Sequence, residues 1–389
     1  MLWILSLLSI LGLMYGYINY RLKQSLQHQP RIQRNLRHYL LFCWLSSPAP
    51  MALRMLDQDG AFADALAWMV NIHLGFFSLL FIWLLVTDLL NLSLQLPRMV
   101  RRWFASPPHT LQADRRAWMQ KSVHVGVLGV CPPVTALGVW QAVRPPVVRE
   151  VHLPIPHLPE ALKTLRIVQF TDLHIGPTIK RKHVEGIVQQ INALQPDIIV
   201  MTGDLVDGSV AHLSDDVAPL AKLNARYGKF FVTGNHEYYS GVMPWLEKIA
   251  ELGLTTLLNA HQMIEHDGVK ILLAGVTDYR AQRYEPTHAS SPAQAIQGAP
   301  ETDLRILLAH QPSTVFEASQ VGFDLQISGH THGGQYYPWN LIAKMANPYI
   351  QGLHHHDGKT WIYVSPGTGY WGPPIRLGTE PEITFFRLG

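Results

Sequence analysis

Long runs without charge dominate the first third of the chain and predict membrane helices. Residues 1–20, 65–87 and 122–143 contain no Asp, Glu, Lys or Arg and are 20, 23 and 22 residues long. A helix needs about 20 apolar residues to cross the hydrocarbon core of a bilayer, so we predict a span in each run. A cleaved signal peptide is a weaker interpretation of residues 1–20, because no basic residue precedes the run and no small-residue cleavage pattern follows it.

A fourth apolar run, residues 39–53, is only 15 residues long and contains Pro48 and Pro50. Basic residues gather at 21–37 and at 98–121, and such loops usually stay in the cytoplasm. The two basic loops share one side only if residues 39–53 cross or re-enter the membrane. This interpretation gives about four helices and places the amino terminus and everything after the last span outside the cytoplasm. If residues 39–53 merely pack on the bilayer, the side of the remaining chain stays open.

After the last span the pattern changes to short apolar runs that alternate with amphipathic stretches. We divide the chain into a transmembrane helical region (1–144), a proline-rich linker (145–164) and a globular domain (165–389). In the domain, apolar residues at positions 184, 187, 188, 191 and 194 predict a helix over 180–195 with one buried face. The strand candidates are residues 165–170, 198–201, 230–233, 271–275, 305–309, 325–328 and 361–364.

The dipeptide Asp267-Gly268 separates two apolar segments, 262–266 and 269–273, and predicts a hairpin turn. Strands mixed with helices, together with this hairpin, indicate an α/β layered fold with a mixed sheet.

Charge divides the chain at the same place. Residues 1–144 carry 13 Lys and Arg against 5 Asp and Glu, a balance of +8, whereas the remainder carries 18 against 23, a balance of −5, and holds 15 of the 20 histidines. Because the basic residues flank apolar runs, they argue for membrane topology and against a nucleic-acid surface. The two cysteines lie in apolar stretches, so the sequence predicts no disulfide framework and no cysteine metal site.

Polar side chains follow five of the strand candidates at the point where each strand ends. In chain order they are Asp172 and His174, then Asp204 and Asp207, then Asn235 and His236, then His310, and finally His330 and His332. In layered α/β sheets ligands bind beyond the carboxyl ends of the strands, so these five loops are expected to converge. Carboxylate, amide and imidazole ligands without a thiolate suit Mn, Fe or Zn, and two such ions can stabilise attack at phosphorus.

The ordered set D-x-H, G-D-x-x-D, G-N-H-E, H and G-H-x-H resembles the calcineurin-like metallophosphoesterase superfamily. The resemblance covers residues 165–388. Three further features resemble the branch of transmembrane proteins with a metallophosphoesterase domain. They are the membrane-linked architecture, the tripeptide Gly333-Gly334-Gln335, and the ending Ser365-Pro366-Gly367 … Pro373-Pro374-Ile375-Arg376-Leu377-Gly378. This resemblance implies a four-layer α/β/β/α sandwich with a dinuclear centre of divalent or transition metal ions.

The same resemblance implies a role for each residue. Asp172, His174 and His332 would hold one metal, Asp204 would bridge, and Asn235, His310 and His330 would hold the other. His236 would stabilise phosphoryl charge or protonate the leaving oxygen, and Asp207 would orient it. One departure from the protein phosphatases of the superfamily is that Gly208-Ser209, and not an Arg that clamps phosphate, follows Asp207. The absence of this Arg argues against phosphoprotein substrates.

The predicted function is therefore a membrane-anchored, metal-dependent hydrolase of phosphoester or pyrophosphate bonds, with lipid-linked or other membrane-associated substrates favoured. The expected partners are a phosphorylated small-molecule or lipid-linked substrate and the lipid bilayer, with no nucleic acid and no obligate protein partner. The expected location is the inner (cell) membrane with the catalytic domain outside the cytoplasm. One alternative is hydrolysis of a nucleotide-linked diacyl sugar pyrophosphate in lipid A synthesis, which would require the cytoplasmic face. Another is a non-catalytic membrane scaffold with a metal-binding domain.

Overall fold

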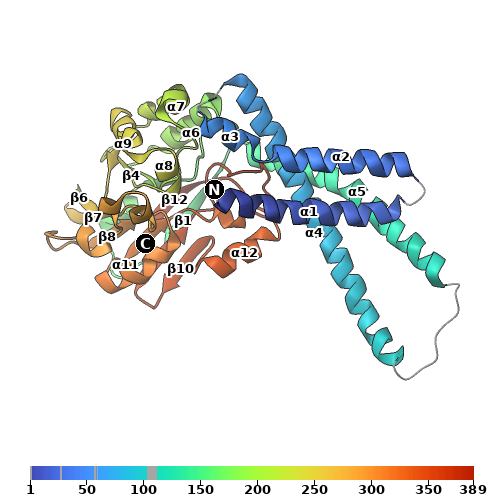
Figure 1. Cartoon of the computed structure of the whole chain (residues 1–389). Coiled ribbons are helices and arrows are strands. Elements are labelled where there is room, and N and C mark those ends of the chain that lie inside the picture. The colour runs from blue at the N-terminus through green and yellow to red at the C-terminus, as the bar shows by residue number, and fades with distance from the viewer. Residues whose placement is uncertain (1, 27–28, 57, 59, 103–111) are drawn as a thin grey trace. The chain divides into compact units, whose positions relative to one another are not determined.

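The computed structural model describes the chain except for residues 1, 27–28, 57, 59 and 103–111. It divides into two compact units, Met1–Val139 and Trp140–Gly389, which we call the helical unit and the catalytic unit. Figure 1 shows the order of the helices and strands along the chain.

The described part of the helical unit consists of helices. They are α1 (Leu2–Ser25), α2 (Pro30–Ser46), α3 (Ala49–Met55), α4 (Ala61–Arg102) and α5 (Gln112–Val143), the last of which ends in the catalytic unit. Among the described residues, two segments are long and apolar enough to cross a membrane, Ala61–Leu96 and Ser122–Val143. They contain the predicted spans 65–87 and 122–143. Residues 2–20 of the predicted span 1–20 lie in α1, and residue 1 is outside the described residues.

The contacts between α1, α2 and α4 show which of these helices run in the same direction. Helices α1 and α4 run the same way, because the ring of Tyr15 packs on Phe77 and Arg21, further along α1, pairs with Asp88, further along α4. Helix α2 runs opposite to α1, since Gln33 donates to Lys23 O near the start of α2 whereas Trp44 donates to Leu8 O near its end.

Residues 39–53, for which a crossing was left open, do not form one continuous helix. Helix α2 ends at Ser46 and α3 begins at Ala49. Pro48 and Pro50 have no N–H to donate to the preceding turn, so they interrupt the helical hydrogen-bond ladder at this point. Any crossing by this segment is therefore made by two helical pieces.

The catalytic unit contains two six-stranded sheets. The first has the order β1 (Val147–Leu153), β12 (Glu382–Leu388), β2 (Ile167–Phe170), β3 (Ile198–Met201), β4 (Lys229–Phe231), β5 (Thr255–Thr256). The second has the order β10 (Gly352–His356), β11 (Thr360–Val364), β9 (Leu325–Ser328), β8 (Leu304–Leu308), β7 (Val269–Gly275), β6 (Ala260–His266). Strands β2 to β5 are parallel in the first sheet, and β7, β8, β9 and β11 are parallel in the second.

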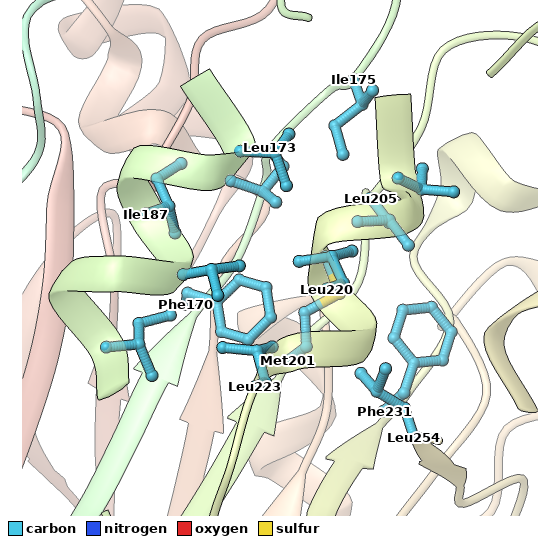
Figure 2. Packing of buried hydrophobic residues seen from close by; sticks show 14 of the residues in the cluster. Phe170, Leu173, Ile175, Ile187, Met201, Leu205, Leu220, Leu223, Phe231 and Leu254 are labelled. Atoms are coloured by element: carbon cyan, nitrogen blue, oxygen red, sulfur yellow. The ribbon is translucent and has the colours of Figure 1, made fainter. Parts of the chain in front are cut away.

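Helices cover the outer face of each sheet. The first sheet packs against α6 (Arg181–Ala193), α7 (Val210–Val217) and α9 (Val242–Glu251), and the second against α10 (Pro292–Ala295) and α11 (Val315–Val321). Figure 2 shows Ile187 of α6 beside strand residues Phe170 and Met201 in the outer core of the first sheet. A separate core between the sheets joins residues such as Ile167 and Ile306. The predicted four-layer α/β/β/α sandwich is confirmed.

The local predictions agree with the structure where periodicity is strong. The helix expected over 180–195 is α6, Arg181–Ala193, and it buries Val184, Ile187, Val188 and Ile191. The predicted hairpin joins β6 to β7, which pair in antiparallel fashion around Asp267 and Gly268. Both turn residues have positive φ, 47° and 82°, as a tight two-residue hairpin turn requires.

The segment 145–164, which the domain division assigns as a linker, contains secondary structure. Residues Val147–Leu153 form β1, which pairs in parallel with the whole of β12. Arg149 Nε donates to Glu382 and Arg387 Nε donates to Glu150 across the pair. Charged residues are common on an edge strand, because one side of it faces solvent. The linker assignment rested on the prolines at positions 154, 156 and 159, which follow this strand, and on the lack of a helical period.

Candidate metal centre

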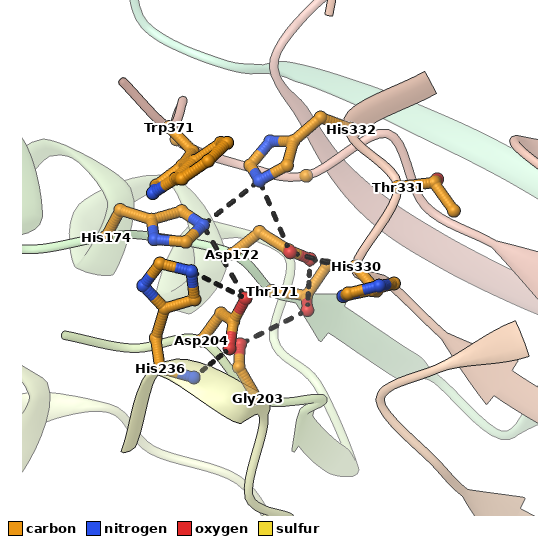
Figure 3. Close-up of polar contacts among 12 residues, drawn as sticks. Thr171, Asp172, His174, Gly203, Asp204, His236, His330, Thr331, His332 and Trp371 are labelled. Atoms are coloured by element: carbon orange, nitrogen blue, oxygen red, sulfur yellow. Dashed lines mark hydrogen bonds and ion pairs between the residues drawn. The ribbon is translucent and has the colours of Figure 1, made fainter. Parts of the chain in front are cut away.

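Five loops meet beyond the carboxyl ends of β2, β3, β4, β8 and β9, as expected for parallel strands in layered sheets. These loops carry the nine predicted site residues, Asp172, His174, Asp204, Asp207, Asn235, His236, His310, His330 and His332. Figure 3 shows several of these side chains directed towards one another from different strands. Most of them are buried in the protein.

One group consists of Asp172, His174 and His332, with one ligand atom from each within 4.8 Å of the others. His174 Nε2 lies 3.0 Å from His332 Nε2, which in turn lies 3.5 Å from Asp172 Oδ1. Burial, followed by the neighbouring His174, lowers the pKa of the His332 ring well below its usual value. His332 is therefore neutral, which is the form of imidazole that binds a metal ion.

A second group consists of Asp204, His310 and His330. His310 Nε2 lies 3.2 Å from both Asp204 Oδ2 and His330 Nδ1. The other nitrogen of His310, Nδ1, lies 2.7 Å from the carbonyl oxygen of Thr202 and donates to it. This bond keeps Nδ1 protonated, so Nε2 is the atom that could bind a metal ion, an arrangement typical of metal-binding histidines. Burial alone would lower the pKa of this ring, but the carboxylate of Asp204 outweighs it and raises the pKa to about 10, so a metal ion at Nε2 would displace a proton.

Asn235 lies beside this group at the start of α8 (Asn235–Tyr239). Its Oδ1 atom is buried and has no hydrogen-bond partner. A buried amide oxygen without a partner is costly, and coordination of a cation would satisfy it. Together with carboxylate and imidazole donors, this orphaned oxygen fits a site for hard or borderline divalent ions.

Asp204 lies between the two groups. Its Oδ2 atom is 3.2 Å from His310 Nε2 and 3.8 Å from His174 Nε2, so one carboxylate is within reach of ligands from both groups. Its other oxygen, Oδ1, accepts the backbone N–H of His236 at 2.9 Å. The position is the one that a bridging ligand would need.

His236 and Asp207 form a close pair at the edge of the site. His236 Nδ1 lies 2.5 Å from Asp207 Oδ1, and His236 Nε2 lies 4.0 Å from Asp204 Oδ2. Burial alone would lower the pKa of His236, but the carboxylates of Asp204 and Asp207 outweigh it and raise the pKa to about 9. Asp207 Oδ2 also lies 3.4 Å from His174 Nδ1, so this carboxylate is close to two imidazoles.

The backbone at the site is strained. Five residues have φ in the left-handed region, namely Asp172 at 54°, His174 at 49°, Asp204 at 52°, His330 at 73° and His332 at 51°. Each costs of order 1–3 kcal/mol in a residue with a side chain, and such residues gather at functional sites. Hydrogen bonds offset part of this cost, for example those from His330 N to both oxygens of Asp172.

Two supporting residues received no role in the sequence analysis. Glu237 is fully buried and accepts the backbone N–H groups of Gly234 at 2.6 Å, Leu205 at 2.7 Å and Asp204 at 3.0 Å. It thereby joins the loops after β3 and β4. The signal was present, because Glu237 directly follows Asn235 and His236 in the polar cluster.

Arg376 is the second supporting residue and is also fully buried. Its Nη2 atom donates to the carbonyl oxygens of Pro366 at 2.8 Å and Gly367 at 3.2 Å, and lies 3.4 Å from His332 Nδ1. Burial lowers the pKa of its guanidinium to about 10, so it remains charged at neutral pH. No spacing rule in the sequence placed this residue next to a ligand that is 44 positions away.

The fold and the site together define a two-sheet α/β domain with adjoining His, Asp and Asn clusters suited to two metal ions. A profile of the calcineurin-like phosphoesterase family matches residues 165–334. An "Uncharacterized metallophosphoesterase" of Aquifex aeolicus is 32% identical over 225 residues, which are 58% of this chain and 85% of that protein. The chain belongs to the calcineurin-like metallophosphoesterases, as its motifs predicted.

The chain is also similar to two animal proteins whose names refer to a membrane. Both are named "Transmembrane protein with metallophosphoesterase domain". The Danio rerio protein is 40% identical over 255 residues, and the Bos taurus protein is 38% identical over 285 residues. The matches cover 64% and 71% of this chain, but only 58% and 64% of those proteins. The chain thus spans about three-fifths of the length of these relatives.

Proposed function

We propose that this chain is a membrane-anchored phosphoesterase that uses two metal ions. The observation that carries the proposal is the position of Asp204, whose Oδ2 atom lies within 4 Å of ligand nitrogens from both groups. Asp172, His174 and His332 would hold one ion, and Asn235, His310 and His330 the other, with Asp204 shared. Mn, Fe and Zn all suit this donor set.

Two divalent ions held there would neutralise charge on phosphoryl oxygens and supply an activated water near neutral pH. The residues of the chain position the substrate and move the proton. His236 is protonated at neutral pH and is the proposed donor to the leaving oxygen or to a phosphoryl oxygen. Asp207, 2.5 Å from His236 Nδ1, would keep the Nε2–H directed into the site.

We further propose that the substrate is a phosphoester or pyrophosphate at a membrane surface. The two apolar helices and the names of the animal relatives support this class. Tethering an enzyme to a surface raises its effective concentration for substrates held there. The complete set of ligand residues argues against the alternative of a non-catalytic scaffold.

The catalytic unit is proposed to lie outside the cytoplasm, at the inner (cell) membrane. Opposite directions of α1 and α2 support an even number of crossings, since they let residues 30–55 return through the bilayer. A periplasm-dependent reporter fused to the carboxyl terminus of the full chain should then be active. Activity of a cytoplasm-dependent reporter alone would reverse the orientation and favour the lipid A substrate.

The catalytic proposal is tested with the full chain in detergent and bis-p-nitrophenyl phosphate. With Mn²⁺ the protein should hydrolyse this diester, and metal analysis should find two ions per chain. Asp204→Asn should lose more than about a hundredfold in kcat/KM, because even loss of an outer-shell partner costs 10–100-fold. Asp267→Asn, in the exposed β6–β7 turn, is the matched control and should be unaffected. Equal rates in the two variants would falsify the assignment.

A further inference from the structure

Helix α12 (Trp339–Ala346) is an apolar helix of the catalytic unit with no buried residue. Met345 is 88% exposed, Leu341 and Ile342 are each 54% exposed, and Trp339 is 37% exposed. Leu341 and Ile342 lie three to four positions before Met345, so these side chains share one side of the helix. A soluble surface rarely displays such a patch without a partner.

This helix is tied to the metal centre. It begins seven residues after His332, and the intervening Gly334 approaches Asn340 so closely that a Cβ atom on Gly334 would overlap the Asn340 backbone. The side chain of Gln335 accepts the N–H of Trp371 at 2.9 Å and donates to its carbonyl oxygen at 3.0 Å. The loop that carries a proposed metal ligand is therefore braced against both α12 and Trp371.

Aromatic residues continue the patch towards the site. Tyr337 is 60% exposed and Trp371 is 55% exposed, while the Trp371 ring lies 5.8 Å from that of His236. Aliphatic side chains with Trp and Tyr beside them and a lysine on the polar side, here Lys344, are typical of helices that lie in the membrane–water interface.

The chain itself favours lipid as the occupant of this surface. Helix α5, which contains a candidate membrane span, ends at Val143, and strand β1 of the catalytic unit begins at Val147. Three residues reach at most about 10 Å. The catalytic unit therefore cannot leave the vicinity of the bilayer, and its exposed apolar surface meets lipid at high effective concentration.

We propose that α12, with Tyr337 and Trp371 beside it, inserts into the surface of the bilayer. The insertion holds the loop of His332 at the level of the lipid headgroups. If the proposed phosphoesterase function is correct, the substrate is then a phosphate group carried by a lipid in the bilayer, taken without leaving it. The docking itself does not depend on that function.

The test uses the full chain in phosphatidylcholine–phosphatidylglycerol vesicles, in a Cys43→Ala/Cys131→Ala background. Met345→Cys is labelled with the fluorophore NBD, and the vesicles contain a lipid with a nitroxide near its headgroup. Phe316→Cys on α11 is the matched control, since Phe316 is also an exposed apolar residue of the catalytic unit, at 51%. We expect blue-shifted emission and several-fold stronger quenching at position 345 than at position 316.

Equal quenching at the two positions would overturn the proposal. A blue shift at position 345 without quenching by the lipid nitroxide would assign the surface to a second copy or another protein, and would overturn it as well. Hydrolysis of bis-p-nitrophenyl phosphate is measured on the same samples. It should match the unlabelled protein, and its absence in every sample would contradict the proposed function while leaving the docking result valid.

Discussion

Polar side chains are arranged differently in the helical unit and around the metal centre of the catalytic unit. In the helical unit polar groups pair with one another: Arg21 Nη2 lies 2.5 Å from Asp88 Oδ1, and Tyr17 Oη donates to Asp88 Oδ2 at 2.5 Å. In the catalytic unit some polar groups pair as well, but around the metal centre titratable side chains converge in threes, as Asp172, His174 and His332 do. Paired polar groups hold helices together, whereas titratable groups that converge mark the place where chemistry can occur.

The largest difference in effect between the two units is expected for glycine-to-alanine substitutions. A Cβ atom on Gly329 would overlap Asp172 Oδ2 and crowd the side chain of Thr171, whereas Gly126 in α5 has open space around the same position. Gly329→Ala should therefore displace a proposed metal ligand. We expect a loss of about a hundredfold or more in kcat/KM, since a displacement of about 1 Å can have that effect, and a loss of about 1–3 kcal/mol in stability.

Gly126→Ala is the matched substitution in the helical unit. It should leave hydrolysis of a soluble diester unchanged and should not lower the melting temperature, because Ala favours a helix over Gly. Both variants are compared by kcat/KM with bis-p-nitrophenyl phosphate and by thermal unfolding. Similar behaviour of the two would mean that the strand-end loops are no more tightly packed than the helices.

Glu237→Gln should have the next largest effect. The substitution keeps the size of the side chain but replaces one acceptor oxygen with an NH₂ group, which then faces either the N–H groups of Asp204 and Gly234 or that of Leu205. Loss of a partner that orients a metal ligand typically costs 10–100-fold in activity or metal affinity. We expect a fall in this range in kcat/KM, together with weaker Mn²⁺ binding measured by titration.

The control for this change is Glu265→Gln, an exposed carboxylate on β6 that should show neither effect. A Glu237→Gln protein with full activity and normal Mn²⁺ affinity would show that the carboxylate only stabilises the fold.

The difference between the units also explains how much the sequence could predict. Proposed ligand residues such as Asp172 and His332 follow short buried strands, so each could be placed at a strand end, and parallel strands bring those ends together. Helix α6 could be placed because its apolar residues repeat with helical spacing. The convergence of the five loops could thus be predicted from local patterns, whereas the role of each residue came from the family resemblance.

Long-range contacts of single residues could not be predicted in this way. Strand β1 pairs with β12 across more than 200 positions, and the prolines that follow it led to a linker assignment. Arg376 reaches His332 through a loop whose path depends on the whole sheet. The break between α2 and α3 was signalled by prolines, but whether the pieces cross a membrane depends on packing that hydropathy does not describe.

The smallest effect on catalysis should come from Asp88→Asn in the helical unit. The change removes the negative charge that pairs with Arg21 and accepts from Tyr17. A hydrogen bond to a charged group contributes about 1.5–3 kcal/mol, so the helical unit should unfold at a lower temperature in detergent. The kcat/KM for a soluble diester should stay within about twofold of the unsubstituted chain, because none of the proposed catalytic groups is altered.

A double-mutant cycle that combines Asp88→Asn with Arg21→Gln measures the coupling free energy of the pair, which we expect at about 0.5–3 kcal/mol. A coupling free energy near zero would show that the two side chains do not hold α1 to α4. A large fall in hydrolysis would show that the paired polar groups of the helical unit also contribute to catalysis, against the comparison made above.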